Sequence, residues 1–127
     1  MVKVTIGHLY PKQMNVYGDM GNIITLRYRL ETRGFTVDYQ PIDDAGDLKL
    51  IKPDILIGGG GQDSNQDVVQ GNLVKNKMFI KNLAESGAVM LMICGLYQLF
   101  GHRFIVSDDH IIEGIGVLDL ETQAGDN

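Results

Sequence analysis

The stretch Ala88-Val-Met-Leu-Met-Ile-Cys-Gly95 decides the fold of this 127-residue chain. Its first six residues are all apolar, which is typical of a parallel β-strand covered on both faces, and we expect this strand to lie at the centre of a sheet. Cys94-Gly95 follows at once and begins a predicted helix. A buried strand, a turn that carries a thiol and a helix are therefore expected in immediate succession.

The flanking segments alternate between strand and helix patterns. Further strands are predicted at residues 2–9, 35–39 and 54–57. Helices are predicted at residues 21–33 (closed by Gly34) and from 63 or 66 to about Glu85, and a short helix or turn at residues 48–51. A hairpin is predicted around residues 104–112, whereas the polar tail, 121–127, carries no packing signal. The alternation predicts an α/β fold with a flavodoxin- or Rossmann-like parallel sheet and helices on both faces.

Length and composition limit the classes of protein. We expect one domain, residues 1–127, and a net charge of −5 argues against nucleic acid or an anionic membrane as a partner. No apolar run approaches the roughly 20 residues of a membrane-spanning helix, and no signal-peptide pattern opens the chain. The single cysteine excludes an internal disulfide and a multi-cysteine metal site, so a reducing, cytoplasmic location is expected.

Ligands of parallel α/β sheets bind beyond the carboxyl ends of the strands, where Cys94 is expected. A thiol near a helix amino terminus is favoured as a thiolate, and the turn resembles a nucleophile elbow in which Gly95 is a small neighbour. The alternative is a buried, inert core thiol, and position alone leaves both interpretations open.

Two other loops are expected at the same carboxyl-terminal edge of the sheet. The glycine run 58–61 could direct two backbone N–H groups at an oxyanion, although it could also cradle a phosphate or form a plain tight turn. In the loop Tyr17-Gly18-Asp19-Met20-Gly21-Asn22, Asp19 or Asn22 could cap a helix or meet the amino or carboxylate group of a substrate.

The three histidines, His8, His102 and His110, are scattered along the chain and show no metal-ligand spacing. None is a convincing general base. Because a thiol hydrolase needs a base to activate the nucleophile and to protonate the leaving amine, the chain looks chemically incomplete.

The turn Met92-Ile-Cys-Gly-Leu-Tyr-Gln98 resembles that of class I, triad-type glutamine amidotransferases, and most closely the cobyric acid synthase-like branch. With residues 15–23, 59–63 and 113–119, the resemblance narrows to the GatD family, the glutaminase subunits of lipid II isoglutaminyl synthases. It covers essentially the whole chain, in order.

This resemblance implies that L-glutamine is hydrolysed through a cysteinyl thioester without a cofactor. The ammonia would pass to a Mur ligase-like, ATP-dependent partner of the MurT type, which amidates the D-glutamate of lipid II. Cys94 would be the nucleophile, Gly95 and either Gly59 or Gly60 would form the oxyanion hole, and Gln98 would help to hold glutamine.

The chain departs from the family pattern at Met92 and Leu96, where small residues are usual, so Leu96 is expected to crowd the turn or shift the glutamine pocket. The family's catalytic histidine lies beyond Asn127. We therefore expect a truncated glutaminase domain that is inactive alone and prone to self-association. The alternatives are a cobyric acid synthase-like amidotransferase domain and a non-catalytic flavodoxin-like binding or scaffold module.

Overall fold

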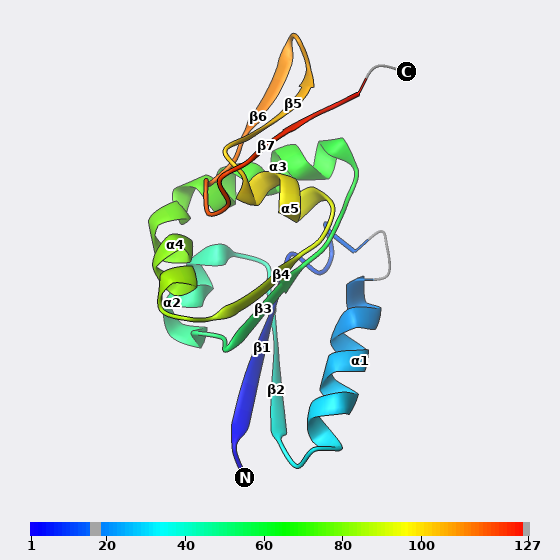
Figure 1. Ribbon diagram of the computed structural model, residues 1–127, viewed down its shortest axis with the longest axis vertical. Coiled ribbons are helices and arrows are strands. Elements are labelled where there is room, and N and C mark those ends of the chain that lie inside the picture. The colour runs from blue at the N-terminus through cyan, green and yellow to red at the C-terminus, as the bar shows by residue number, and fades with distance from the viewer. Residues whose placement is uncertain (16–18, 126–127) are drawn as a thin grey trace.

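The chain is built on a four-stranded parallel sheet (Figure 1). The computed structural model describes residues 1–15 and 19–125, with the backbone alone at residues 63–65. The strand order is β2-β1-β3-β4, formed by β1 (Lys3–Leu9), β2 (Thr36–Ile42), β3 (Ile55–Gly58) and β4 (Val89–Met92). All three neighbouring pairs are parallel, and this order is that of flavodoxin-like folds, which confirms the predicted fold class.

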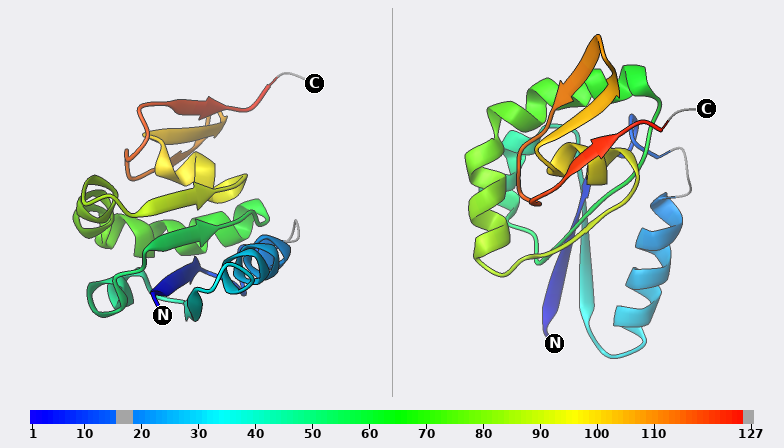
Figure 2. Two further views of the ribbon diagram at one scale, coloured as in Figure 1. Left: turned by 60° about the horizontal axis from the view of Figure 1, so that its bottom comes forward. Right: turned by 45° about the horizontal axis from the view of Figure 1, so that its top comes forward.

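Helices cover both faces of this sheet, as predicted (Figure 2). They are α1 (Asp19–Glu31), the 3₁₀ turn η1 (Ala45–Asp47), α2 (Leu48–Ile51), α3 (Asp63–Lys75), α4 (Lys77–Glu85) and α5 (Gly95–Phe100). None of the helices in the described ranges is both long and apolar enough to cross a bilayer.

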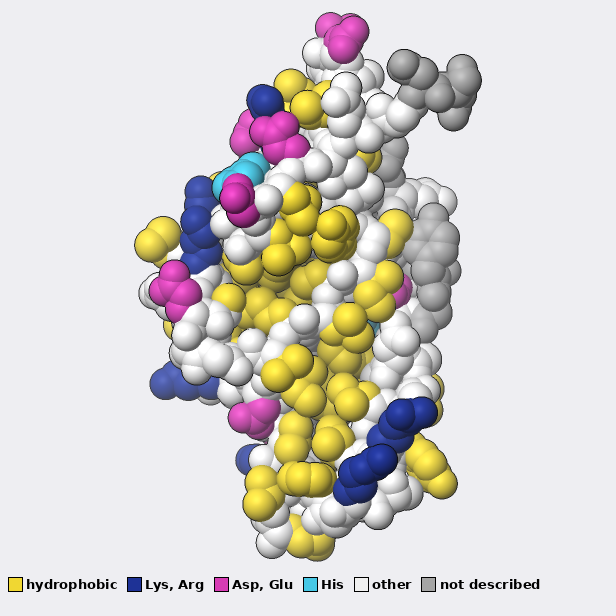
Figure 3. Space-filling model, viewed as in Figure 1, with side chains coloured by type: hydrophobic (Ala, Val, Ile, Leu, Met, Phe, Trp, Pro, Cys, Tyr) yellow, Lys and Arg dark blue, Asp and Glu magenta, His cyan; other side chains and the backbone are white. Residues whose placement is uncertain are grey.

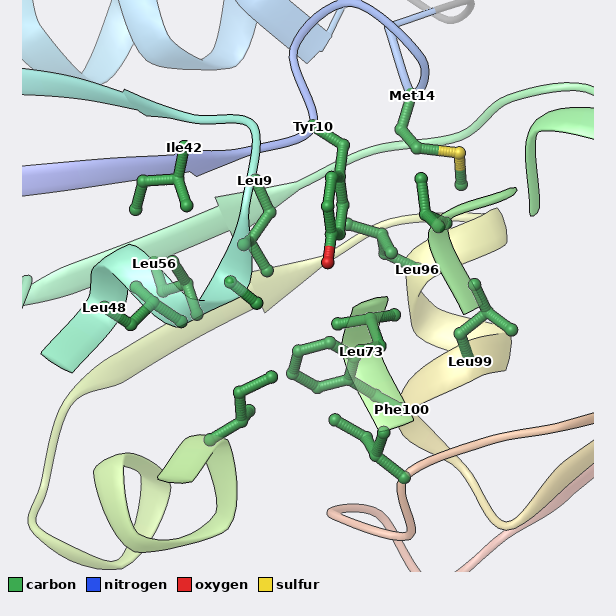
Figure 4. Packing of buried hydrophobic residues seen from close by; sticks show 14 of the residues in the cluster. Leu9, Tyr10, Met14, Ile42, Leu48, Leu56, Leu73, Leu96, Leu99 and Phe100 are labelled. Carbon is green, nitrogen blue, oxygen red and sulfur yellow. The ribbon is translucent and has the colours of Figure 1, made fainter. Parts of the chain in front are cut away.

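Alternation along the strands divides the core between the two faces. Ile6 and Ile57 point toward α1 and pack with Ile23, whereas Leu9 and Leu56 point to the other face. There they join the larger cluster shown in Figure 4, to which α2, α3, α4 and α5 all contribute side chains. The two faces are thus buried by different parts of the chain.

The predicted long helix after the glycine run is two helices. The break falls at Asn76, whose φ of −107° and ψ of 15° leave the helical region, and not at Gly71, which stays inside α3. The Asn76 side chain is buried and donates to the Asn72 carbonyl, so the break is stabilised by a local hydrogen bond that no apolar periodicity reveals. Gly87, with a φ of +100°, follows the end of α4 as predicted.

The expectation that residues 88–93 form a central strand is wrong. Within the described residues, β4 pairs only with β3 and therefore forms an edge of the sheet. Val89 is 61% exposed and Leu91 45% exposed, and apolar side chains gather on this side of the molecule (Figure 3). An apolar run indicates that a strand is hydrophobic, but it does not indicate how many neighbouring strands pair with it.

A smaller sheet packs beyond α5 and α3, with the order β6-β5-β7 (Figure 1). The predicted hairpin is confirmed as β5 (Arg103–Ser107) and β6 (His110–Glu113). The tail was expected to carry no packing, but β7 (Glu121–Gln123) pairs in parallel with β5. The side chains of β7 are polar, and the strand is held by backbone hydrogen bonds to β5. Such bonds leave no signal in the hydrophobic pattern of the sequence.

The Asn72 side chain of α3 hydrogen bonds to the segments that follow β1 and β2. Its Oδ1 accepts hydrogen bonds from the Tyr10 hydroxyl and, at 2.8 Å, from the Ala45 N–H, while its Nδ2 donates to Asp44 at 2.9 Å. Burial, and secondarily the charge of Asp44, raises the pKa of the Tyr10 phenol, so Tyr10 remains a donor at physiological pH. The end of β1 and the connection after β2 are held together through this one amide.

We predict that Asn72→Ala lowers the free energy of unfolding by about 2 kcal/mol, because the Tyr10 hydroxyl and the Ala45 N–H lose their acceptor. Urea denaturation measures this change. The matched control is Asn82→Ala on an exposed face of α4, which should shift stability by no more than about 0.5 kcal/mol. Equal effects of the two variants would contradict the role given to Asn72.

Candidate functional site

Cys94 lies on a strained turn between β4 and α5. Its φ of 52° and ψ of −112° fall in a backbone region that residues other than glycine rarely adopt. The residue is exposed. The strand, the strained thiol and the helix follow one another without a break, as in the nucleophile elbow predicted from the sequence. Of the two interpretations left open for Cys94, the exposed position argues against a buried core thiol.

The elbow is bound to the glycine loop, residues 58–61, by backbone hydrogen bonds. The Ile93 N–H donates to the Gly58 carbonyl at 2.9 Å, and the Leu96 N–H donates to the Gly59 carbonyl at 3.1 Å. These bonds continue the β3–β4 pairing past the ends of the strands. The structure thus brings the predicted oxyanion residues Gly59 and Gly95 onto adjoining segments.

The Leu96 side chain points into the hydrophobic core. It is fully buried among Tyr10, Leu99 and their neighbours (Figure 4), and a methyl group built on Gly58 would lie 2.1 Å from its Cδ1 atom. The large residue after the elbow is accommodated because the first residue of the glycine loop has no side chain.

Asp19 lies against the same loop from the other side. The residue is 1% exposed, and its Oδ2 accepts a hydrogen bond from the Gly60 N–H at 3.3 Å. A methyl group on Gly59 would lie 1.9 Å from the Asp19 carboxyl carbon, so the carboxylate sits directly over the glycine backbone. Of the two predicted alternatives for the second oxyanion donor, Gly60 already has a partner here.

His8 of β1 is buried near Asp19, which no sequence pattern indicated. Its Nδ1 is 3.0 Å from the Tyr39 hydroxyl on β2, and the two rings lie at a tilt, with centroids 6.1 Å apart. Burial lowers the pKa of His8, and the charge of nearby Asp19 partly opposes this shift. The ring is therefore neutral at physiological pH.

Gln98 faces Gln66, a residue that the sequence analysis missed. The Gln66 Nε2 donates to the Gln98 Oε1 at 3.4 Å, and Gln66 is 3% exposed. A methyl group on Gly95 would lie 2.9 Å from the Gln66 Nε2 and 2.7 Å from the Met14 Cε atom. The Gln66 amide and the end of the Met14 side chain thus both lie against Gly95, the first residue of α5.

The loop before α1 is only partly described, and the predicted residues Tyr17 and Gly18 lie outside the described ranges. The Met20 N–H donates to the Asn15 side chain at 3.0 Å, so Asn15 takes the capping role that the sequence suggested for Asp19 or Asn22. Asn22 is exposed on the first turns of α1.

The other two histidines are engaged at the surface. His102 Nε2 is 2.9 Å from Asp119, and His110 Nε2 is 3.4 Å from Asp67. Across the part of the chain that the structure describes, no histidine hydrogen bonds to Cys94, and no group of three or more His, Cys, Asp or Glu residues could hold a metal ion. A hollow of about 480 Å³ lies at the opposite end of the sheet, lined by residues that precede β3 and β4.

A flavodoxin-like sheet with an exposed thiol on a strained strand-to-helix turn defines an α/β domain suited to nucleophilic chemistry. The chain belongs to the family of CobB/CobQ-like glutamine amidotransferase domains, whose sequence profile matches residues 5–127. The resemblance found from the motifs is therefore confirmed.

The chain is also similar to individual proteins with known names. The chain is 36% identical to the lipid II isoglutaminyl synthase (glutamine-hydrolyzing) subunit GatD of Staphylococcus aureus strain N315, over 100% of this chain and 52% of the relative. It is 39% identical to the same subunit of Streptococcus pneumoniae strain R6, over 91% of this chain and 45% of the relative. Cobyric acid synthase of Listeria monocytogenes strain EGD-e is 33% identical over 56% of this chain and 15% of that enzyme. The chain spans about half the length of the GatD relatives.

We predict that Gly58→Ala lowers the free energy of unfolding by about 2 to 3 kcal/mol, because the added methyl group overlaps the Leu96 side chain. In a Leu96→Ala background the same substitution should cost at least about 1 kcal/mol less, since the clash is gone. A double-mutant cycle by urea denaturation measures this coupling.

Gly71→Ala is the control, because nothing lies within 4 Å of a methyl group built at this position. Since alanine favours the helix over glycine, this substitution should raise the free energy of unfolding by about 0.5 to 1 kcal/mol. Strict additivity of Gly58→Ala and Leu96→Ala would contradict the packing described.

Proposed function

We propose that residues 1–127 are the front part of a single glutaminase domain that hydrolyses L-glutamine through a cysteinyl thioester on Cys94. The observation that carries this proposal is the strained, exposed elbow at Cys94, hydrogen bonded to the glycine loop, in a chain of the glutamine amidotransferase family. No cofactor is required for this chemistry.

In the proposed reaction the Cys94 thiolate attacks the side-chain carboxamide carbon of glutamine. The C–N bond breaks, and the nitrogen takes a proton and leaves as ammonia. Water then cleaves the thioester, which releases glutamate and the thiol. Backbone N–H groups stabilise the oxyanion in both steps, and losing one such donor typically slows a hydrolase by about 100- to 1,000-fold.

Gly95 and Gly59 are the proposed oxyanion donors. Gly60, the alternative, is disfavoured because its N–H already donates to Asp19 and because the Gly59 carbonyl of the same peptide group points to Leu96. A planar trans peptide directs its carbonyl and its N–H to opposite sides, so the Gly60 N–H faces away from the elbow. Gln98 is proposed to hold the glutamine, with Asp19 and Asn22 as further candidates for its amino or carboxylate group.

The general base is proposed to come from outside residues 1–127. His8 lies two strands away from β4, about 10 Å across the sheet, and is engaged with Tyr39. His102 and His110 pair with surface carboxylates. We therefore expect residues 1–127 alone to hydrolyse glutamine slowly or not at all.

The proposed recipient of the ammonia is a Mur ligase-like, ATP-dependent subunit of the MurT type that amidates the D-glutamate of lipid II in the cytoplasm. This proposal is supported by relatives named as lipid II isoglutaminyl synthase subunits, which match 91% and 100% of the chain. A cobyric acid synthase-like role has the weaker support of a match to 56% of the chain.

The glutaminase proposal predicts that 6-diazo-5-oxo-L-norleucine, a reactive glutamine analogue, labels Cys94. We expect labelling in a version of the chain extended past Asn127 and bound to the synthetase partner, with slower or no labelling of residues 1–127. Mass spectrometry of the Cys94 peptide measures it.

Cys94→Ser in the extended complex should lower glutaminase activity by roughly 1,000-fold or more, as the loss of a covalent nucleophile does in other hydrolases. Iodoacetamide modification provides the control for thiol access. An accessible thiol that the analogue never labels would favour a non-catalytic binding or scaffold module instead.

We further propose that the isolated chain self-associates through the β4 edge. This edge leaves one row of backbone groups without a strand partner among the described residues. Beside it lies a groove of about 220 Å³ lined by apolar residues of β4, α5 and the segment after β6. Such an edge with an apolar surface favours pairing with a second copy.

We predict that Val89→Lys combined with Leu91→Lys shifts the isolated chain toward monomer, because two charges would have to be buried on pairing. Analytical ultracentrifugation over a range of concentrations measures the shift. The control is Leu50→Lys, which changes an apolar residue that is 90% exposed on α2 and should leave association unchanged. A chain that is monomeric at every concentration would contradict self-association.

A further inference from the structure

Gln66 is a buried amide of α3 that is only half satisfied. The residue is 3% exposed, and in the described part of the chain its Oε1 is buried without a hydrogen-bond partner. Buried polar atoms are nearly always paired, because an acceptor that loses water and gains no donor destabilises the fold. An apolar side chain of similar size would fill this space without that loss, so packing alone does not explain an amide here.

The side-chain hydrogen bond of Gln66 reaches the proposed site. Its Nε2 donates to the Gln98 Oε1 at 3.4 Å, and α3 packs against α5. A methyl group built on Gly95 would lie 2.9 Å from the same nitrogen, so the Gln66 amide lies against the residue that follows Cys94. Hydrogen bonds in enzyme sites are often long before the substrate binds and tighten in the complex, and 3.4 Å fits that behaviour.

The hydrogen bond from Gln66 determines which end of the Gln98 amide remains available. Gln98 lies one turn along α5 from Cys94, and its backbone N–H donates to the Cys94 carbonyl at 3.0 Å. An amide side chain has one oxygen that accepts and one nitrogen that donates. With the oxygen engaged by Gln66, the donor end is left over, and no hydrogen bond within the described residues uses it.

We propose that Gln66 is a positioning residue, whose Nε2–H holds the Oε1 of Gln98 and so directs the Gln98 Nε2–H groups at the α-carboxylate of the substrate glutamine. This inference rests on the proposed glutaminase function. A carboxylate only accepts hydrogen bonds, so it matches the donor end of the amide. The side-chain carbonyl of the substrate is taken by the proposed oxyanion donors, Gly95 and Gly59. A Gln98 amide turned the other way would face the carboxylate with its oxygen and repel it.

The first test is the kinetics of Gln66→Met in the extended complex with its partner. Methionine keeps about the length of the side chain and removes the donor. We expect the KM for glutamine to rise by about tenfold, with kcat within about threefold of wild type. A KM that stays within about threefold of wild type would overturn the proposal.

Gln70→Met is the matched control for this test. Gln70 lies one turn further along α3, and its Nε2 donates to the Glu113 carbonyl at 3.1 Å, away from α5. The KM of this variant should equal that of the wild type. An equal rise of KM in both variants would overturn the proposal, because any loss of an amide from α3 would then have the same effect.

A double-mutant cycle tests whether Gln66 acts through Gln98. Gln98→Ala should raise the KM for glutamine, and adding Gln66→Met to it should change the KM by no more than about twofold, since the group that Gln66 positions is gone. Independent effects of the two substitutions, which multiply in the double variant, would contradict a positioning role.

The stability of Gln66→Met separates positioning from packing. Because the substitution removes a buried acceptor that has no partner, the midpoint of urea denaturation should be equal to that of the wild type or higher. A purely structural role of Gln66 predicts the opposite sign. A lower midpoint would therefore overturn the argument that the amide serves the site.

The hydrogen bond itself is tested by NMR on residues 1–127, without any measurement of activity. Gln98→Ala should raise the rate at which the carboxamide protons of Gln66 exchange with water by about fivefold or more, whereas Gln70→Ala should leave it unchanged. An unchanged rate in Gln98→Ala would overturn the proposal. A failure of the analogue to label Cys94 would reject the glutaminase function and leave this exchange result standing. Normal labelling with an unchanged KM in Gln66→Met would reject the role of Gln66 alone.

Discussion

The peptide group between Gly59 and Gly60 is held at both ends, and the candidate site depends on this constraint. Its carbonyl accepts the Leu96 N–H of the elbow, and its N–H donates to the buried Asp19. Because a peptide group is planar, the two bonds leave it no freedom to rotate. The contact requires close approach on both sides, which is possible only where the backbone carries no side chain. Three segments far apart in the sequence thereby become one rigid site.

Much of this site could be predicted from the sequence, because strand ends and turns locate residues along an α/β sheet. The thiol, Gly95 and the glycine loop lie on adjoining segments as expected. The inward direction of Leu96 and the approach of Gln66 could not be predicted, since they depend on how each helix is rotated against the sheet. His8 was not recognised for a similar reason: a lone histidine in a strand pattern does not show which neighbour its ring meets.

A similar share of the fold could be predicted from the sequence. Periodicity and turn residues identified the parallel strands, the helices on both faces and the hairpin. The errors fall where backbone or amide hydrogen bonds determine the structure and hydrophobicity does not, as in the helix break at Asn76 and the polar strand β7. The edge position of β4 was missed for another reason, since pairing partners are a property of the whole sheet.

The edge position of β4 has a consequence for how the Cys94 thiol can be covered by another polypeptide. Cys94 continues directly from β4, with the glycine loop on one side and no strand of the described chain on the other. Any polypeptide that adds a strand to this edge and runs past Met92 reaches the turn that carries Cys94. Completing the sheet and enclosing the proposed nucleophile would then be one event, so that the thiol would be covered by the same surface that completes the sheet.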